Sequence, residues 1–123
     1  MKAKKSKRGL SLLELLLNIA IISILLAVLI VGIFKARVRA FDANTQSYLH
    51  NLVVAQIDHF MHAGVFATSE SDLLGAPYKS PYIHLEAWVI GVNDFCIQAR
   101  YNSLGTSSFF SRSSGELFSG SCP

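Results

Sequence analysis

An apolar run near the amino terminus places the strongest constraint on how this chain can fold. The 25 residues from Leu10 to Phe34 contain one charged side chain, Glu14. As an α-helix this run would extend about 37 Å, enough to cross a hydrocarbon core about 30 Å thick. An ionised carboxylate near the centre of that core costs on the order of 3 kcal/mol. The run therefore predicts a membrane-spanning helix in which Glu14 requires a cationic partner or a place near the interface.

Positive charge is concentrated before this run. The chain has 123 residues, a net charge of +3 and a pI near 9.0, and five of its eleven basic residues lie in the first nine positions. The other six basic residues face all eight acidic ones. The basic leader predicts an amino terminus held in the cytoplasm, with the part after Phe34 outside. The alkaline pI therefore reflects a topogenic leader, and we expect no direct nucleic-acid binding.

A glycine, Gly9, separates the leader from the apolar run. A secretory signal has an apolar region of about 7–15 residues followed by a small-residue cleavage site, and this run is too long and lacks such a site after it. Cleavage after Gly9 would keep the apolar helix on the mature chain. It would also create a free α-amino group at Leu10, which is the cation that Glu14 requires.

These residues resemble the prepilin signature of the type IV pilin family. That signature is a basic leader ending in glycine, an apolar residue, Ser or Thr, two aliphatic residues, Glu and a long apolar helix. The matching residues are Gly9, Leu10, Ser11, Leu12, Leu13 and Glu14. The resemblance implies that a prepilin peptidase cuts between Gly9 and Leu10 and methylates the new amino terminus of Leu10. It also implies that Glu14 neutralises an amino-terminal amine during filament assembly.

The resemblance further implies a structural pilus subunit. Its partners would be other copies of itself in a helical filament, the prepilin peptidase, an inner-membrane assembly platform and, before assembly, membrane lipid. It would reside in the bacterial inner membrane and then in an extracellular pilus, or fimbrium, that serves motility, adhesion or DNA uptake in natural transformation. Two features depart from the usual pattern: Leu10 stands where phenylalanine is common, and the stretch Val28–Gly32 lacks the helix-loosening proline of many relatives.

The chain divides into three predicted parts: the leader (1–9), a transmembrane and filament-core helix (10–34) and a globular headgroup (35–123). The helix is expected to continue to Ala63, with Gly64 as its C-cap. Its predicted core-facing stripe recurs at steps of mostly three and four residues. The stripe comprises Val38, Phe41, Tyr48, Leu52, Ile57 and Phe60. A loop over residues 65–81 is expected to hold a short helical turn capped by Ser69 or Ser71.

Beyond this loop the apolar period changes to two, which indicates antiparallel strands. The expected strands cover residues 82–90, 95–101, 108–112 and 117–123, separated by turns rich in Gly, Asn and Ser. The residues predicted to face the helix are Ile83, Leu85, Ala87, Val89, Phe95, Ile97, Ala99 and Tyr101. The predicted fold class is therefore α+β, a long amino-terminal helix packed on a three- to four-stranded antiparallel sheet. The pilin family has the same architecture.

Two cysteines, Cys96 and Cys122, lie on the side of the apolar run that would be exported. An even number in a small extracytoplasmic domain favours one disulfide, and the alternative is two buried free thiols. A bridge would join the second predicted strand to the carboxy-terminal segment.

No pattern of residues points to catalysis. His59 and His62 are one helical turn apart beside Asp58, but neither CxxC nor HExxH accompanies them. Nucleophile motifs and phosphate-binding loops are missing from the sequence, so we expect no enzyme, no metal and no cofactor. Two alternatives remain: a pseudopilin of a type II secretion or competence system, and a single-pass signal-anchor protein with a small ligand-binding exodomain.

Overall fold

The computed structural model describes residues 9–123 and contains one long helix and a small sheet. Helix α1 comprises Leu12–Ala63, so the helix predicted for residues 10–63 is confirmed except for its first two residues. The chain divides into two units after Lys35, and each unit is described by itself. The predicted leader lies outside the described residues except for Gly9.

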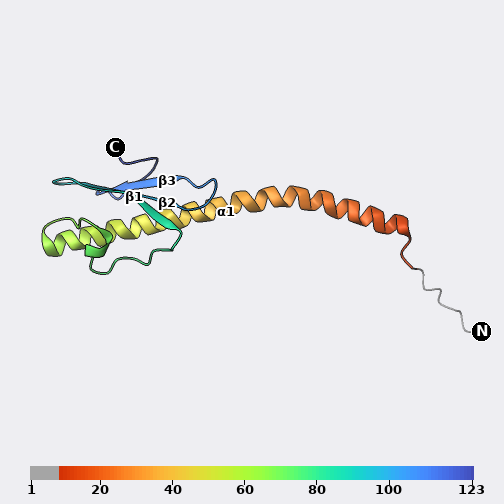
Figure 1. Ribbon diagram of the computed structural model, residues 1–123, viewed down its shortest axis with the longest axis horizontal. Helices are drawn as coiled ribbons and strands as arrows, with labels where there is room; N and C mark the ends of the chain where they lie inside the picture. Colours follow the sequence, from red (N-terminus) through yellow and green to blue (C-terminus); the bar gives the residue numbers. More distant parts are fainter. Residues whose placement is uncertain (1–8) are drawn as a thin grey trace, which may run out of the picture. The chain divides into compact units, whose positions relative to one another are not determined.

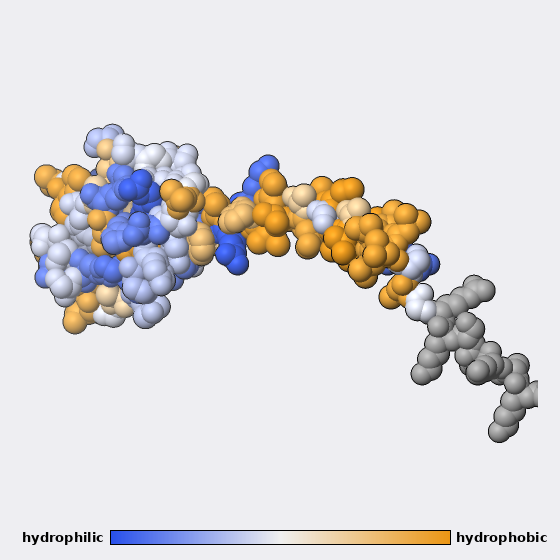
Figure 2. All heavy atoms as spheres, turned by 45° about the vertical axis from the view of Figure 1, so that its right-hand side comes forward, coloured by the Kyte–Doolittle hydropathy of each residue, from blue (hydrophilic) through white to orange (hydrophobic). Residues whose placement is uncertain are grey.

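The first unit is the apolar half of α1, from Leu12 to Phe34. Every large apolar side chain in this half is at least 49% exposed. Figure 2 shows a hydrophobic surface on the visible face of this half of the helix. Within the described residues α1 is the one helix that is long and apolar enough to cross a membrane, as judged by length and composition.

The second unit begins with the other half of α1, which buries one face. The buried residues are Thr45, Tyr48, Leu49, Leu52, Val53 and Gln56. These positions follow the 3.6-residue period, as expected for a helix that packs one stripe on a core. The predicted stripe is confirmed at Tyr48 and Leu52. It is wrong at Ile57 and Phe60, which are each 40% exposed and lie outside the core cluster. Ile57 follows Gln56 by one residue and so points about 100° away from the buried face.

Helix α1 ends at Ala63, where the chain turns in a left-handed glycine. Gly64 has φ +73°, and its N–H donates to the carbonyl of Phe60 at 2.8 Å, which confirms the predicted C-cap. The loop that follows contains one turn of 3₁₀ helix, η1 (Glu70–Asp72). Ser69 occupies the N-cap position, but its hydroxyl donates to the Asp72 carboxylate rather than accepting from the backbone of the turn.

Four strands form one antiparallel meander in the order β1-β2-β3-β4. They are β1 (Ile83–Ile90), β2 (Phe95–Tyr101), β3 (Ser108–Arg112) and β4 (Leu117–Ser119). The predicted α+β class is therefore confirmed, and Figure 1 shows the strands alongside the carboxy-terminal half of α1. The inner face of the sheet contributes Ile83, Phe95, Ile97, Ala99 and Phe109 to a core shared with the buried face of the helix.

A β-bulge in β1 overturns part of the predicted strand pattern. Leu85 pairs with Ala99 but Ala87 pairs with Gln98, so Glu86 is the additional residue. Because one inserted residue reverses the faces of all later ones, Trp88 and Ile90 pack on the core. Ala87 and Val89 were expected there, and Val89 is instead 50% exposed. The inward set predicted for β2 is confirmed, since Phe95, Ile97 and Ala99 are buried and Tyr101 packs against the core.

Aromatic contacts at both ends of β2 set its direction relative to the helix. Tyr101 stacks on Phe41 with ring centroids 4.4 Å apart, whereas Phe95 packs edge-on against Phe66, which stacks on Phe60. We call the end with helix residues 36–42 and the β2–β3 loop the proximal end. The end with Phe60 and the β1–β2 turn is the distal end.

Candidate functional site

The amino terminus of α1 brings two of the signature residues into contact. The Glu14 Oε2 atom accepts from the Ser11 N–H at 3.1 Å, and the Glu14 N–H donates to the Ser11 hydroxyl at 3.2 Å. This reciprocal pair is a capping box, which satisfies donors that the first turn of a helix leaves free. The sequence pattern Ser-x-x-Glu before an apolar run is the signal of such a box, and the role predicted for Glu14 did not include it.

The two residues that precede the capping box have no regular secondary structure. Gly9 and Leu10 are exposed, and the Leu10 side chain is 73% exposed. A Cβ atom at Gly9 would meet nothing within 4 Å. Packing within the described chain therefore gives no reason for a glycine at this position.

The proximal end carries uncompensated positive charge. Arg37 and Arg39 are both exposed, and neither forms an ion pair with a residue that the structure describes. The nearby carboxylate of Asp42 accepts a hydrogen bond from the Ser107 N–H at 3.0 Å. Figure 2 shows hydrophilic side chains where the apolar surface of the helix ends.

The predicted disulfide between Cys96 and Cys122 is confirmed. Their Cα atoms are 6.0 Å apart, within the range of ordinary disulfides. A second link supports the same connection, because the Cys122 N–H donates to Gln98 Oε1 at 3.0 Å. The carboxy-terminal segment is thus held on the outer face of the sheet by one covalent bond and one hydrogen bond.

The bulge residue Glu86 organises the polar residues on that outer face. Its carboxylate accepts hydrogen bonds from Gln98 and from the Ser108 hydroxyl, and it forms an ion pair with Arg100 at 3.0 Å. Burial raises the pKa of Glu86, but these hydrogen bonds and the Arg100 charge outweigh burial and lower it overall. The network connects β1, β2 and the first residue of β3.

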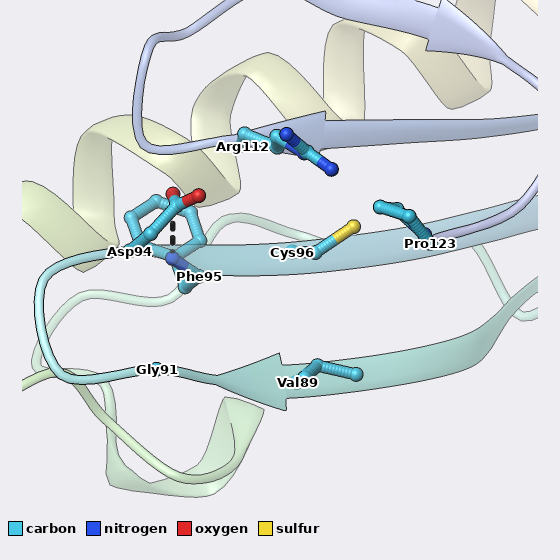
Figure 3. Close-up of a pocket in the computed structure, with 7 residues that line it drawn as sticks. All are labelled: Val89, Gly91, Asp94, Phe95, Cys96, Arg112 and Pro123. Carbon is cyan, nitrogen blue, oxygen red and sulfur yellow. Dashed lines mark hydrogen bonds between the residues drawn. The ribbon is translucent and has the colours of Figure 1, made fainter.

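A shallow depression at the distal end is lined in part by Cys96, one of the two disulfide cysteines (Figure 3). Asp94 and Arg112 are its charged lining residues. Asp94 Oδ1 accepts from the backbone N–H of Phe95 at 2.8 Å and from both the N–H and the hydroxyl of Ser113. Hydrogen bonding from Ser113 keeps the pKa of Asp94 below its ordinary value. This carboxylate therefore joins two turns.

A tyrosine–glutamate–lysine network connects α1 to the loop before β1. The buried Tyr48 hydroxyl donates to Glu70 Oε1 at 2.6 Å, and Lys79 Nζ lies 2.8 Å from Glu70 Oε2. Burial raises the pKa of Glu70, but hydrogen bonds from Lys79 and Tyr48 and the Lys79 charge lower it overall. Burial, followed by the Glu70 contact, raises the pKa of Tyr48, so its hydroxyl remains a donor.

The histidines singled out in the sequence do not converge on a shared site. His62 Nδ1 lies 2.9 Å from the carbonyl of Asp58, the ordinary partner one helical turn earlier. Among residues 9–123 no group of three or more His, Cys, Asp or Glu side chains could hold a metal ion.

The sequence of this chain is similar to that of a known pilus protein. No model of a known protein family matches the chain. The chain is 30% identical, over 100 residues, to a protein of Thermus thermophilus described as the type IV wide pilus major component PilA4. That match covers 80% of this chain and 76% of the relative. With this similarity, the apolar helix, the antiparallel sheet and the disulfide, the chain belongs to the type IV pilin family, whose members are structural proteins and not enzymes.

Proposed function

We propose that this chain is a structural subunit of a type IV pilus, made as a precursor and polymerised into a surface filament. The observation that carries this proposal is the apolar half of α1, whose large apolar residues are each at least 49% exposed. The similarity to a major component of a type IV pilus supports the same proposal. Its 23 residues from Leu12 to Phe34 extend about 34 Å, which suits a bilayer first and a bundle of neighbouring helices afterwards.

The proposed membrane orientation follows from charge. Five basic residues in the first nine positions favour an amino terminus in the cytoplasm, against Lys35, Arg37 and Arg39 on the other side. The disulfide-bonded sheet then lies outside the bacterial inner membrane, where oxidation is favoured. Membrane lipid is the partner before assembly, and other copies of the chain are the partners in the filament.

Processing is proposed between Gly9 and Leu10, by a prepilin peptidase that also methylates Leu10. Two observations support this site: the peptide is exposed, and no packing in the described chain requires Gly9 to be glycine. A requirement from outside the chain, such as a protease subsite, explains the glycine better. A bulky residue at Gly9 should leave uncleaved precursor in the membrane, and efficient processing of that variant would contradict the site.

Glu14 is proposed to bind an amino-terminal amine during assembly. Its carboxylate already lies near the start of the helix, 3.1 Å from the Ser11 N–H, and cleavage would create the amine one residue earlier. In a water-poor environment a carboxylate is stabilised when a fixed cation and hydrogen bonds accompany it. The inner-membrane assembly platform would supply the force that moves the subunit from lipid into the filament.

The test separates charge from helix capping. Glu14→Gln keeps an acceptor that suits a capping box and removes the charge, whereas Ser11→Ala removes the cap and keeps the charge. We expect Glu14→Gln to be inserted and cleaved but to form few or no filaments by electron microscopy, and Ser11→Ala to form them. Normal filaments from Glu14→Gln would contradict the proposed pairing. Mass measurement of the amino terminus should show a methylated chain beginning at Leu10, whereas a signal-anchor protein would keep Met1.

A further inference from the structure

The proximal end exposes an apolar side chain at the tip of the β2–β3 loop. Leu104 is 94% exposed, and the whole loop, residues 102–107, contains no charged side chain. A single exposed leucine is ordinary on a protein surface. Its position is what distinguishes this one, because the loop packs beside the residues of α1 that follow the apolar half.

Two contacts hold the loop against the first turns of the headgroup helix: the Ser107 N–H donates to Asp42, and the adjoining Tyr101 ring stacks on Phe41. Gly105 also lies near Val38, since a Cβ atom added at Gly105 would be 3.5 Å from the Val38 side chain. Val38 follows Phe34, the last residue of the apolar run, by four residues, or about 6 Å along a helix. The loop tip is therefore tied to the part of α1 that would leave the bilayer.

Hydrogen bonds fix the shape of this loop. The Thr106 hydroxyl lies 2.7 Å from the carbonyls of both Tyr101 and Ser103, and the Asn102 N–H donates to the Tyr82 carbonyl at 2.6 Å. The loop is therefore already ordered, so insertion of Leu104 into a lipid interface would not incur the conformational entropy cost of ordering it.

Other residues of the proximal end match the chemistry of an anionic bilayer surface. Arg37 and Arg39 are exposed and unpaired within the described residues, and each such cation near an anionic lipid surface contributes about 1 kcal/mol. Tyr82 is 57% exposed and packs on Tyr101, and tyrosine is enriched at membrane interfaces.

The distal end provides the contrast. Val92, in the β1–β2 turn, is 93% exposed, almost the same as Leu104. It lies beyond the opposite end of β2, whose seven residues span about 20 Å. Asp94 stands two residues after Val92 with a lowered pKa, and Arg112 lies beside it, so this exposed residue is accompanied by an acid and a base rather than by two arginines.

We propose that the β2–β3 loop is a lipid-contact site. Leu104 inserts into the interface of an anionic bilayer while Arg37 and Arg39 bind its phosphate groups, so the proximal end of the headgroup rests on the membrane before assembly. This inference rests on the proposed function, because it requires α1 to span the bilayer.

Tryptophan at the two matched positions tests the proposal. The full-length variants Leu104→Trp and Val92→Trp are reconstituted into vesicles of phosphatidylethanolamine and phosphatidylglycerol, with or without brominated acyl chains. The unmodified chain supplies the signal of Trp88, which is subtracted. We expect blue-shifted emission and strong bromine quenching at position 104, and water-like emission without quenching at position 92. Adding Arg37→Gln and Arg39→Gln to Leu104→Trp should reduce the quenching.

Resistance to alkaline extraction distinguishes the two levels of the proposal. If the variants remain in the membrane but position 104 behaves like position 92, the lipid-contact site is wrong and the membrane anchor stands. Release of the unmodified chain by alkali would overturn both. Quenching at position 104 that is unchanged in neutral phosphatidylcholine vesicles, or in the arginine variants, would contradict the role assigned to the two arginines.

Discussion

The residues of α1 before Lys35 and those after it expose their apolar side chains to opposite extents. Leu25 is 59% exposed, whereas Leu49 and Leu52 are completely buried. The first half contains almost only aliphatic residues, and its helix has no core of its own within the described chain. The second half alternates apolar and polar residues and shares a core with the sheet. The two halves of one continuous helix therefore differ in where their apolar side chains can be buried. The first half needs a medium outside the chain, whereas the second half uses the core of the chain itself.

The sharpest test of this contrast is one substitution made in each half. Leu49→Ala should lower the free energy of unfolding of the headgroup by about 2–5 kcal/mol, because it removes buried contacts and leaves a cavity. Leu25→Ala should leave that free energy unchanged. Denaturant unfolding of the detergent-solubilised chain, followed by Trp88 fluorescence, measures both. Equal destabilisation by the two variants would show that the apolar half packs on the headgroup.

The disulfide should affect the stability of the headgroup and not the retention of the apolar half of α1 in the membrane. Replacing Cys96 and Cys122 together by serine should lower headgroup stability by roughly 3 kcal/mol, since the bridge closes a separation of 26 residues. The same double variant should be extracted from membranes by alkali no more readily than the unmodified chain. Easier extraction would mean that the sheet also helps to hold the apolar half in place.

The Tyr48–Glu70–Lys79 network should make the headgroup sensitive to acid. Tyr48→Phe should lower the free energy of unfolding by about 2 kcal/mol near neutral pH, because it removes a hydrogen bond to a charged group. The exposed Tyr78→Phe is the matched control and should have no effect. A lack of difference between these two variants would mean that the Tyr48 hydroxyl contributes nothing to stability.

The sign of the pH effect follows from the lowered pKa of Glu70. Its contribution is present above pH 4.5, the ordinary value for the group, and is lost as the pH falls through the lower pKa of the folded state. Glu70→Gln should therefore be less stable than the unmodified chain at neutral pH, and the difference should shrink in acid. A difference that grows in acid would contradict this assignment.

The smallest expected effects come from two hydroxyls that make the same bond in different surroundings. Ser23 donates to the Ile19 carbonyl at 2.7 Å in the apolar half, and Thr45 donates to the Phe41 carbonyl at 3.1 Å in the headgroup. Thr45→Ala should cost about 1 kcal/mol, because it removes a fully buried methyl group. Ser23→Ala should change headgroup stability by less than the error of the same unfolding experiment. A clear loss for Ser23→Ala would again indicate contact between the halves.

Much of the fold could be predicted because it depends on local patterns. The apolar run, the change from a period of 3.6 to a period of two, and Gly64 are each visible in a short stretch of chain. The Cys96–Cys122 pair could be predicted because the chain has only two cysteines. The Ser11–Glu14 capping box is equally local, because the pattern Ser-x-x-Glu before an apolar run is its sequence signal.

By itself the sequence determined the helix and the strands. It also predicted that a membrane surrounds one part of the chain and that an oxidising compartment surrounds another. Tertiary structure decided what lies inside the headgroup. The bulge at Glu86 reversed the facing of Trp88 and Val89, and the burial of Thr45 and Gln56 displaced Ile57 from the core. The physical reason is that local periodicity sets which residues share a face. Which face is buried depends on strand register and on partners distant in the chain, such as the Ala67 carbonyl that accepts from Gln56.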